Sequence, residues 1–126
     1  MFLKKAIFSV LAAIILSVNA YAAELPSLAQ AEIAHLLVYL STSGCEFYRN
    51  GSWYNAEAAR SHLERKYKYL LKKQLISSAE DFIAKAATQS SMSSETYQVR
   101  CGKDIFPCAA WLNAELARLR QKQALP

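Results

Sequence analysis

The sequence predicts an α+β protein dominated by helices, with about four helices and a small antiparallel β-hairpin or three-stranded sheet. Apolar residues recur at helical spacing in four segments, which is typical of helices that bury one face. Asn50-Gly51 lies between two aromatic-rich runs, and this is the strongest short signal for a hairpin. The chain has 126 residues, 53% of them hydrophobic and 20% charged, which suits one domain with a modest core.

Residues 1–22 have the layout of a secretory signal peptide. Two lysines precede an apolar run, and Ala20-Tyr21-Ala22 is a small-residue cleavage motif. The run is shorter than the roughly 20 residues of a membrane helix, although an uncleaved anchor is the alternative. We expect cleavage after Ala22, which leaves residues 23–126 as a single periplasmic domain without a transmembrane segment. Loss of the two lysines lowers the formal net charge from +5 to +3.

The first helix is predicted over residues 27–43. Pro26 precedes Ser27, and Ser27-x-x-Gln30 has the pattern of a capping box. Gly44 suits the position just after the last turn. The predicted apolar face comprises Ala29, Ile33, Leu36, Leu37 and Leu40.

A two-residue turn at Asn50-Gly51 fixes the pairing of the hairpin. Because an isolated hairpin is marginal in water, we expect a third strand, and residues 96–101 alternate suitably. The pattern leaves open whether Tyr48 and Trp53 are core residues or an exposed aromatic surface for a partner. The predicted pairs are Arg49 with Ser52, Tyr48 with Trp53, and Phe47 with Tyr54.

The chain has three cysteines, all after the predicted cleavage site. Export to an oxidising compartment favours a disulfide, and the odd number leaves one thiol over. We favour Cys45–Cys101, because a third strand beside the hairpin would bring these two together, although the other two pairings stay open. Cys108 would then be either a buried thiol or a reactive one at a helix start.

Three further helices follow the hairpin. Asn55 can cap a helix over residues 56–74, and Ser77-x-x-Glu80 has the pattern of a capping box for a third helix that ends near Thr88. Residues 89–95 are polar and serine-rich, which predicts a loop. Pro107 suits the first position of a last helix over residues 107–121. Each helix has an apolar face. In the second helix the face comprises Ala56, Ala59, Leu63, Tyr67, Leu70 and Leu71. In the third it comprises Phe82, Ile83 and Ala86, and in the last Trp111, Leu112, Leu116 and Leu119.

A set of short motifs occurs in order between Glu32 and Leu116. The motifs are Arg49-Asn50-Gly51, Glu57-Ala58, His62-Leu63-x-x-Lys66, Ser78-Ala79-Glu80-x-Phe82-Ile83, Ser90-Ser91-x-Ser93, Tyr97 and Trp111-Leu112-x-x-x-Leu116. The set resembles the YfeK-like family of small exported bacterial proteins, a domain of unknown function. The resemblance implies a periplasmic protein of Gram-negative bacteria and assigns no chemistry. The family often has glycine where this chain has Ser94, and serine disfavours a positive φ there.

The second helix carries a basic face opposite its apolar stripe, formed by Arg65, Lys68 and Lys72. Such a face is either simply solvated or a surface for an anionic partner, such as lipid headgroups or an acidic protein. Nucleic acid is not expected as a partner, because the protein is predicted to be exported with a mature charge of only +3.

His62 and Lys66 lie one helical turn apart and carry the strongest candidate site. Nearby lysines favour a neutral His62, which can hold an anion or act as a base if Arg49 or the serine loop, with Ser91 and Ser93, approaches. The plainer interpretation is a histidine bonded to a backbone carbonyl.

Arg49 has two interpretations of its own. It can present its guanidinium at the hairpin tip to an anionic ligand, or it can pair internally with Glu46 or Glu57.

No metal or cofactor is expected. His35, His62 and Cys108 lack the spacing of metal ligands. A serine of the loop at residues 90–93 could act with His62, but the G-x-S-x-G elbow of hydrolases is absent.

The leading function is therefore a non-enzymatic periplasmic binding or interaction module. Its partner is a periplasmic protein or an anionic envelope component, and its oligomeric state stays open. The contact residues are Arg49, His62, Lys66, Ser91 and Ser93. One alternative is a small envelope hydrolase or transferase that uses His62 with a serine of the loop, and another is a structural, stress-related protein with no site.

Overall fold

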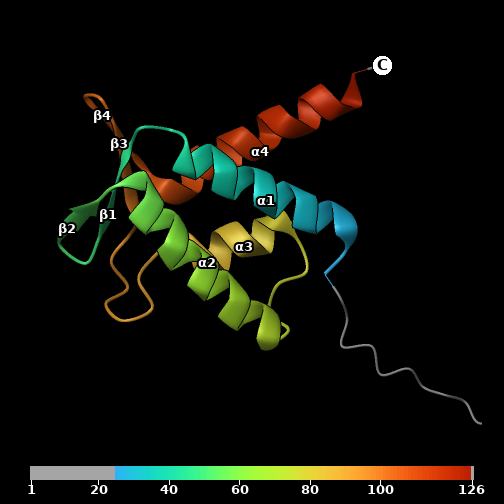
Figure 1. Cartoon of the computed structure of the whole chain (residues 1–126), viewed down its shortest axis with the longest axis horizontal. Coiled ribbons are helices and arrows are strands. Elements are labelled where there is room, and N and C mark those ends of the chain that lie inside the picture. The colour runs from blue at the N-terminus through green and yellow to red at the C-terminus, as the bar shows by residue number, and fades with distance from the viewer. Residues whose placement is uncertain (1–24, 126) are drawn as a thin grey trace, which may run out of the picture.

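The computed structural model of the chain describes residues 25–125, so the predicted signal peptide lies outside the described residues. The element order is helix, two strands, two helices, two strands and helix (Figure 1). The elements are α1 (Ser27–Ser41), β1 (Glu46–Arg49), β2 (Ser52–Tyr54), α2 (Ala56–Lys72), α3 (Ala79–Ala86), β3 (Gln98–Cys101), β4 (Asp104–Pro107) and α4 (Cys108–Ala124).

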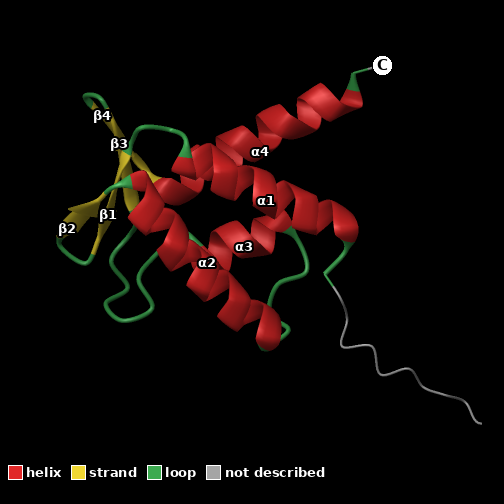
Figure 2. Ribbon diagram, viewed as in Figure 1, coloured by secondary structure: helices red, strands yellow, loops and turns green. Residues whose placement is uncertain are grey.

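The predicted helix-dominated α+β architecture is confirmed. The sheet lies at one end of the molecule and the four helices gather at the other (Figure 2). Helices α1 and α3 are central to the packing, because each contacts the other three helices. None of the described helices is long and apolar enough to cross a membrane.

The sheet has four antiparallel strands in the order β2-β1-β3-β4. The hairpin register is the predicted one, and Asn50 and Gly51 both have positive φ, as the tight turn requires. The expected third strand pairs with β1. The prediction of at most three strands is wrong by one, because it missed β4 (Asp104–Pro107). This strand is exposed throughout and ends in proline, so its sequence lacks an alternating pattern. Pro107 ends this strand rather than occupying the first turn of α4.

The core fills the space between the helices and the inner face of the sheet. Ile33, Leu36 and Phe82 are fully buried, and Phe47 and Val99 bring the sheet into the same cluster. The Phe47 ring packs edge-on against Trp111 of α4.

The outer face of the sheet carries Tyr48 and Trp53. Their rings pack edge to face with centroids 5.5 Å apart, and the Arg100 guanidinium lies 4.0 Å from the centre of the Trp53 indole ring. Both aromatic residues are half-buried, so the pair is neither core nor fully exposed.

The predicted Cys45–Cys101 disulfide is present, with the two Cα atoms 4.6 Å apart. Cys45 lies just before β1 and Cys101 ends β3, and these two strands are neighbours. Cys108 is the free thiol and is buried.

Two of the predicted helix caps, at Ser27 and at Ser77, are wrong. The Ser27 side chain makes no capping hydrogen bond, because α1 begins directly after Pro26 and Gln30 Nε2 donates instead to the Leu25 carbonyl. The cap of α3 is Ser78 rather than Ser77, since the Ser78 hydroxyl accepts from the Asp81 amide. The cap of α2 is Asn55, as predicted.

Ser94 has a φ of +61°, which corrects the expectation that serine would avoid this conformation. The turn is held by its own hydrogen bonds. The Ser94 amide donates to the Ser90 carbonyl, and the buried Ser90 hydroxyl accepts from the Met92 and Ser93 amides. These bonds offset the cost of a left-handed residue with a side chain.

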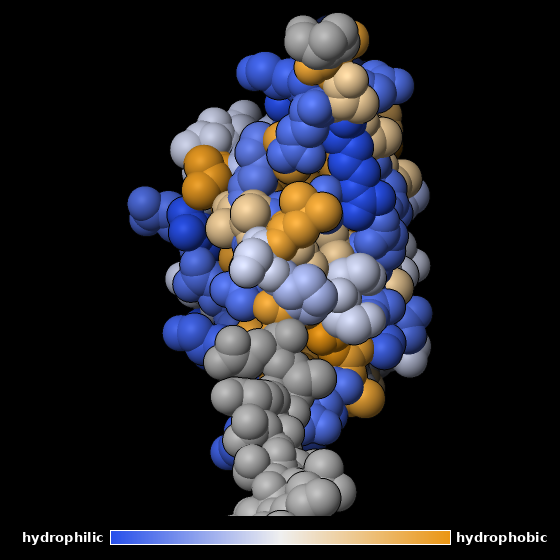
Figure 3. Space-filling view, turned by 90° about the vertical axis from the view of Figure 1, so that its right-hand side faces the viewer, coloured by the Kyte–Doolittle hydropathy of each residue, from blue (hydrophilic) through white to orange (hydrophobic). Residues whose placement is uncertain are grey.

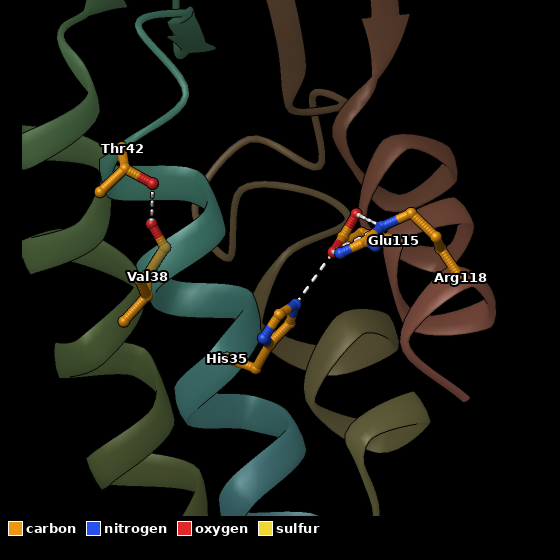
Figure 4. Close-up of polar contacts among 5 residues, drawn as sticks. All are labelled: His35, Val38, Thr42, Glu115 and Arg118. Carbon is orange, nitrogen blue, oxygen red and sulfur yellow. Dashed lines mark hydrogen bonds and ion pairs between the residues drawn. The ribbon is translucent and has the colours of Figure 1, made fainter. Parts of the chain in front are cut away.

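Buried carboxylates tie α4 to the other helices, a feature that the sequence did not suggest. Glu115 is buried on α4, and His35 of α1 reaches it at 2.9 Å while Arg118 contacts it from the other side (Figure 4). Glu32, also buried, receives two hydrogen bonds from Arg120, at 2.8 and 3.0 Å.

Arg120 also contacts Glu80 at the start of α3. Its guanidinium therefore joins three helices.

Seen from the helical end, hydrophilic side chains cover most of the coloured surface and apolar groups lie apart from one another (Figure 3).

Candidate functional site

Three segments converge beside the hairpin and bring together the strongest predicted residues. Arg49 ends β1, His62 and Lys66 lie one turn apart on α2, and Tyr97 comes just before β3. Nη1 of Arg49 lies 2.9 Å from Nδ1 of His62, and Nε2 of His62 lies 3.0 Å from the Tyr97 hydroxyl oxygen. Nζ of Lys66 lies 3.0 Å from the same hydroxyl oxygen. The four residues thus form one continuous hydrogen-bonded chain.

Donor and acceptor chemistry fixes the tautomer of His62. A guanidinium can only donate, so Nδ1 facing Arg49 must be the unprotonated nitrogen. The proton then lies on Nε2, which donates to the Tyr97 oxygen. That oxygen also accepts from Lys66, so both of its lone pairs are used.

The surroundings keep the imidazole of His62 neutral. Burial lowers its pKa, and the positive charges of Arg49, Lys66 and Arg65 lower it further, to about 4. The sequence predicted a neutral His62 from the nearby lysines, and burial adds the larger contribution.

Lys66 is held by two acceptors. Its Nζ donates to the Tyr97 hydroxyl and to the carbonyl of Gln89, both at 3.0 Å. Burial lowers the pKa of Lys66, and the charge of Arg49 lowers it further. Both effects favour the neutral form of the Lys66 amine relative to a fully solvated lysine.

On the inner side of the chain of hydrogen bonds lies a small cavity of about 30 Å³. Arg49, His62 and Tyr97 line it together with apolar side chains and the buried Cys108. The volume suits about one water molecule. This cavity is therefore too small to hold a ligand larger than a water molecule.

On the outer side, a larger concavity of about 260 Å³ lies between α2, α3 and the serine-rich loop. Three of its lining side chains are cationic, namely Arg65, Lys66 and Lys85. Ser91 adds a hydroxyl, and none of the acidic residues that the structure describes lines the concavity. We call this feature the cationic concavity. Every charged group in it attracts anions.

The predicted site residues fall into two groups. Arg65 and Ser91 line the cationic concavity with His62 and Lys66. Ser93 lies elsewhere, since its hydroxyl donates to the Asn50 side-chain oxygen at 2.5 Å and joins the serine loop to the hairpin tip.

Lys68 and Lys72 are exposed on α2. Arg49 does not line the cationic concavity directly and acts on it through His62.

Two residues of the site were missed from the sequence. Tyr97 was noted as an alternating strand residue and as one motif of the family resemblance, and nothing in its spacing showed that its hydroxyl would meet Lys66. Lys85 lies on α3, which was considered only for its apolar face, and its Nζ donates to the Leu75 carbonyl at 2.7 Å.

The plainer interpretations of Arg49 and His62 are wrong. The Arg49 guanidinium meets His62 and lies over the Tyr54 ring, whereas Glu46 pairs with Arg100. His62 bonds to two side chains rather than to a backbone carbonyl. Since both ring nitrogens are engaged, no serine of the described chain forms a Ser–His pair with it.

His35, His62 and Cys108, which the sequence did not favour as metal ligands, do not form one cluster: His35 meets Glu115, whereas His62 meets Arg49 and Tyr97. Among residues 25–125, no group of three or more histidine, cysteine, aspartate or glutamate side chains could hold a metal ion. Burial raises the pKa of the Cys108 thiol to about 12, which keeps it protonated.

These features define a small helix-dominated α+β protein with a Cys45–Cys101 disulfide and a cationic concavity between α2, α3 and the serine-rich loop. The chain belongs to a family of unknown function, DUF5329, whose model matches residues 27–120. No curated protein and no solved structure matches the chain. The expected domain of unknown function is thus confirmed.

Proposed function

We propose that the chain is a non-enzymatic binding module of the bacterial envelope that holds an anionic group in the cationic concavity. One observation carries the proposal: three cationic side chains and a serine hydroxyl line one hollow, and no carboxylate among residues 25–125 lines it. Phosphate, sulfate and carboxylate groups accept hydrogen bonds from lysine, arginine and serine. The partner is an anionic envelope component or an acidic segment of a periplasmic protein.

The hydrogen-bonded chain behind the concavity supports this role. Tyr97 and Gln89 hold the Lys66 amine in place, so little side-chain entropy is lost when an anion binds. The neutral imidazole of His62 lies between the positive charges of Arg49 and Lys66. It adds no third positive charge, so the two cations can lie close to each other.

A periplasmic location is part of the proposal. It is supported by the signal-peptide layout of residues 1–22, by the resemblance to YfeK-like exported proteins and by the disulfide, which is typical of oxidising compartments. Intact-mass measurement of the protein purified from a Gram-negative periplasm is expected to show a chain that begins after Ala22. A chain that keeps residues 1–22 would contradict cleavage.

Binding can be tested with inorganic phosphate as the probe. Titration of the ¹⁵N-labelled protein is expected to shift amide resonances of α2, α3 and the serine loop at their shared hollow. Lys85→Ala is expected to weaken binding about tenfold, which corresponds to about 1.4 kcal/mol. Lys72→Ala removes an exposed lysine of the basic face and is the matched control, with an expected change below twofold.

Equal losses of phosphate affinity in the Lys85→Ala and Lys72→Ala variants would mean that diffuse surface charge attracts the anion. That result would overturn the proposed site. The natural partner can then be sought by brief crosslinking in the periplasm and capture at low and high salt. Because charge-mediated contacts between exposed groups are screened by salt, capture through the concavity is expected to weaken at high salt.

A further inference from the structure

The two acceptors of Lys66 leave one direction of its amine open. An ammonium group has three N–H donors, and two of them point to the Gln89 carbonyl and the Tyr97 hydroxyl. No third acceptor within the described chain hydrogen-bonds to Nζ. Lys66 lines the cationic concavity, so the remaining direction is open to a ligand there.

This arrangement accommodates the neutral amine without losing a contact. When the third proton leaves, the two remaining N–H groups keep their acceptors, and the lone pair takes the open position. The lone pair thus takes the one position on the nitrogen that no acceptor of the described residues occupies, on a side chain that lines the cationic concavity. Burial and the charge of Arg49 both favour the neutral form. A desolvated lysine beside another cation is a recognised form of activated nucleophile.

We propose that Lys66 is a nucleophilic amine and that the cationic concavity captures a small anionic aldehyde or ketone by forming a Schiff base with it. The inference rests on the proposed function for the anionic part of the ligand, and it adds a covalent step at one lysine. Arg65, Lys85 and Ser91 would hold the anionic group while the carbonyl carbon faces Nζ. A concavity of about 260 Å³ suits a small molecule.

The step balances without an oxidant or a reductant. The ammonium group first releases one proton to solvent, and the nitrogen lone pair attacks the carbonyl carbon. The C–N bond forms, and the π electrons move to oxygen, which takes up one of the two protons on nitrogen. A proton from solvent then joins the hydroxyl group, the nitrogen lone pair forms the C=N bond, and the C–O bond breaks as water leaves. Overall, an ammonium group and a carbonyl give a protonated imine and one water molecule. The protonated imine keeps one N–H, which can still donate to Tyr97 or Gln89.

The test uses pyridoxal 5′-phosphate, which carries an aldehyde and a phosphate, with cyanoborohydride to convert the imine into a stable amine. The disulfide-intact protein is treated with limiting reagent, and the labelled lysines are located by mass spectrometry. We expect Lys66 to be labelled at least tenfold faster than Lys68 and Lys72, which are exposed on the same helix. Pyridoxal, which lacks the phosphate, is expected to label Lys66 several-fold more slowly.

Lys66→Arg keeps the positive charge and removes the primary amine, so it is expected to abolish the fast label. Even labelling of all exposed lysines, or a fast label that persists in this variant, would overturn the proposal. The position-resolved rates of the unaltered protein do not depend on how well the variant folds.

The same experiment separates the two proposals. Phosphate binding without preferential labelling of Lys66 would overturn the nucleophile and leave the anion site standing. Preferential labelling that is equal for pyridoxal and its phosphate, and that inorganic phosphate does not slow, would support the nucleophile and overturn the anion site.

Discussion

Arg49 Nη1 donates to His62 Nδ1 across 2.9 Å, which joins the end of a strand to the second turn of the helix that follows the hairpin. Since the guanidinium only donates, this contact requires a neutral imidazole with its proton on Nε2. The Nε2 proton is donated to the Tyr97 hydroxyl oxygen, and the same oxygen accepts a hydrogen bond from Nζ of Lys66. The protonation of one histidine is thereby coupled to the placement of the lysine in the cationic concavity.

The first prediction concerns pH. The pKa of His62 is about 4 in the folded protein, against an ordinary value of 6.5. Between these two values the unfolded state binds more protons, so the free energy of unfolding falls as the pH decreases from about 6.5 to about 4. Because the ring is partly exposed, we expect a loss of about 1–2 kcal/mol, less than the full shift would give. Urea unfolding at a series of pH values measures it, and His62→Gln is expected to flatten this part of the profile.

The second prediction concerns the Tyr97 hydroxyl, which accepts from both His62 and Lys66. Tyr97→Phe leaves these two donors without their partner at a partly buried place, so we expect a loss of about 1–3 kcal/mol in the free energy of unfolding. Tyr69→Phe is the control, since Tyr69 is 60% exposed, and its effect is expected to stay within about 0.5 kcal/mol. Similar effects of the two substitutions would contradict a special role for the Tyr97 hydroxyl.

The third prediction concerns Glu32, whose side chain is 4% exposed and is paired with Arg120. Arg120→Ala leaves a buried carboxylate without its cation, and we expect the free energy of unfolding to fall by about 3 kcal/mol. Adding Glu32→Gln removes the stranded charge and is expected to recover part of the loss. A double variant as unstable as the sum of the single ones would contradict this coupling.

The fourth prediction concerns the Cys45–Cys101 bond, which spans a sequence separation of 56. In the chain-entropy model, a cross-link of this span stabilises the folded state by about 4 kcal/mol. Thermal unfolding with and without a reductant is expected to show a clearly lower midpoint for the reduced protein. An unchanged midpoint would mean that the sheet forms fully without the cross-link.

The fifth prediction concerns Cys108, which is buried and whose thiol has a pKa of about 12. We expect no alkylation of this thiol by iodoacetamide in the native protein at pH 8, because only the thiolate reacts. One alkylated cysteine is expected after unfolding without reductant. Fast alkylation of the native protein would contradict burial.

Much of the fold follows from local signals in the sequence. The hairpin register around Asn50-Gly51 is determined by turn chemistry between neighbouring residues, and the Asn55 cap by one side chain and the amide three residues on. The Cys45–Cys101 pair followed because strand pairing predicted from alternation brought both cysteines to one place. The strand Asp104–Pro107 was missed, since an exposed edge strand ending in proline carries no periodic signal.

The sequence by itself determined the helices, the hairpin and the basic character of α2, because each depends on spacing along the chain or on composition, and it favoured one of three possible disulfides. Tertiary structure alone decided that Arg49, His62, Tyr97 and Lys66 form one hydrogen-bonded chain and that Lys85 shares a hollow with Lys66. These contacts join segments up to 35 positions apart, and their geometry depends on how two helices and a sheet pack. Side-chain hydrogen bonds act only over about 3 Å, so no periodicity in the sequence can encode them.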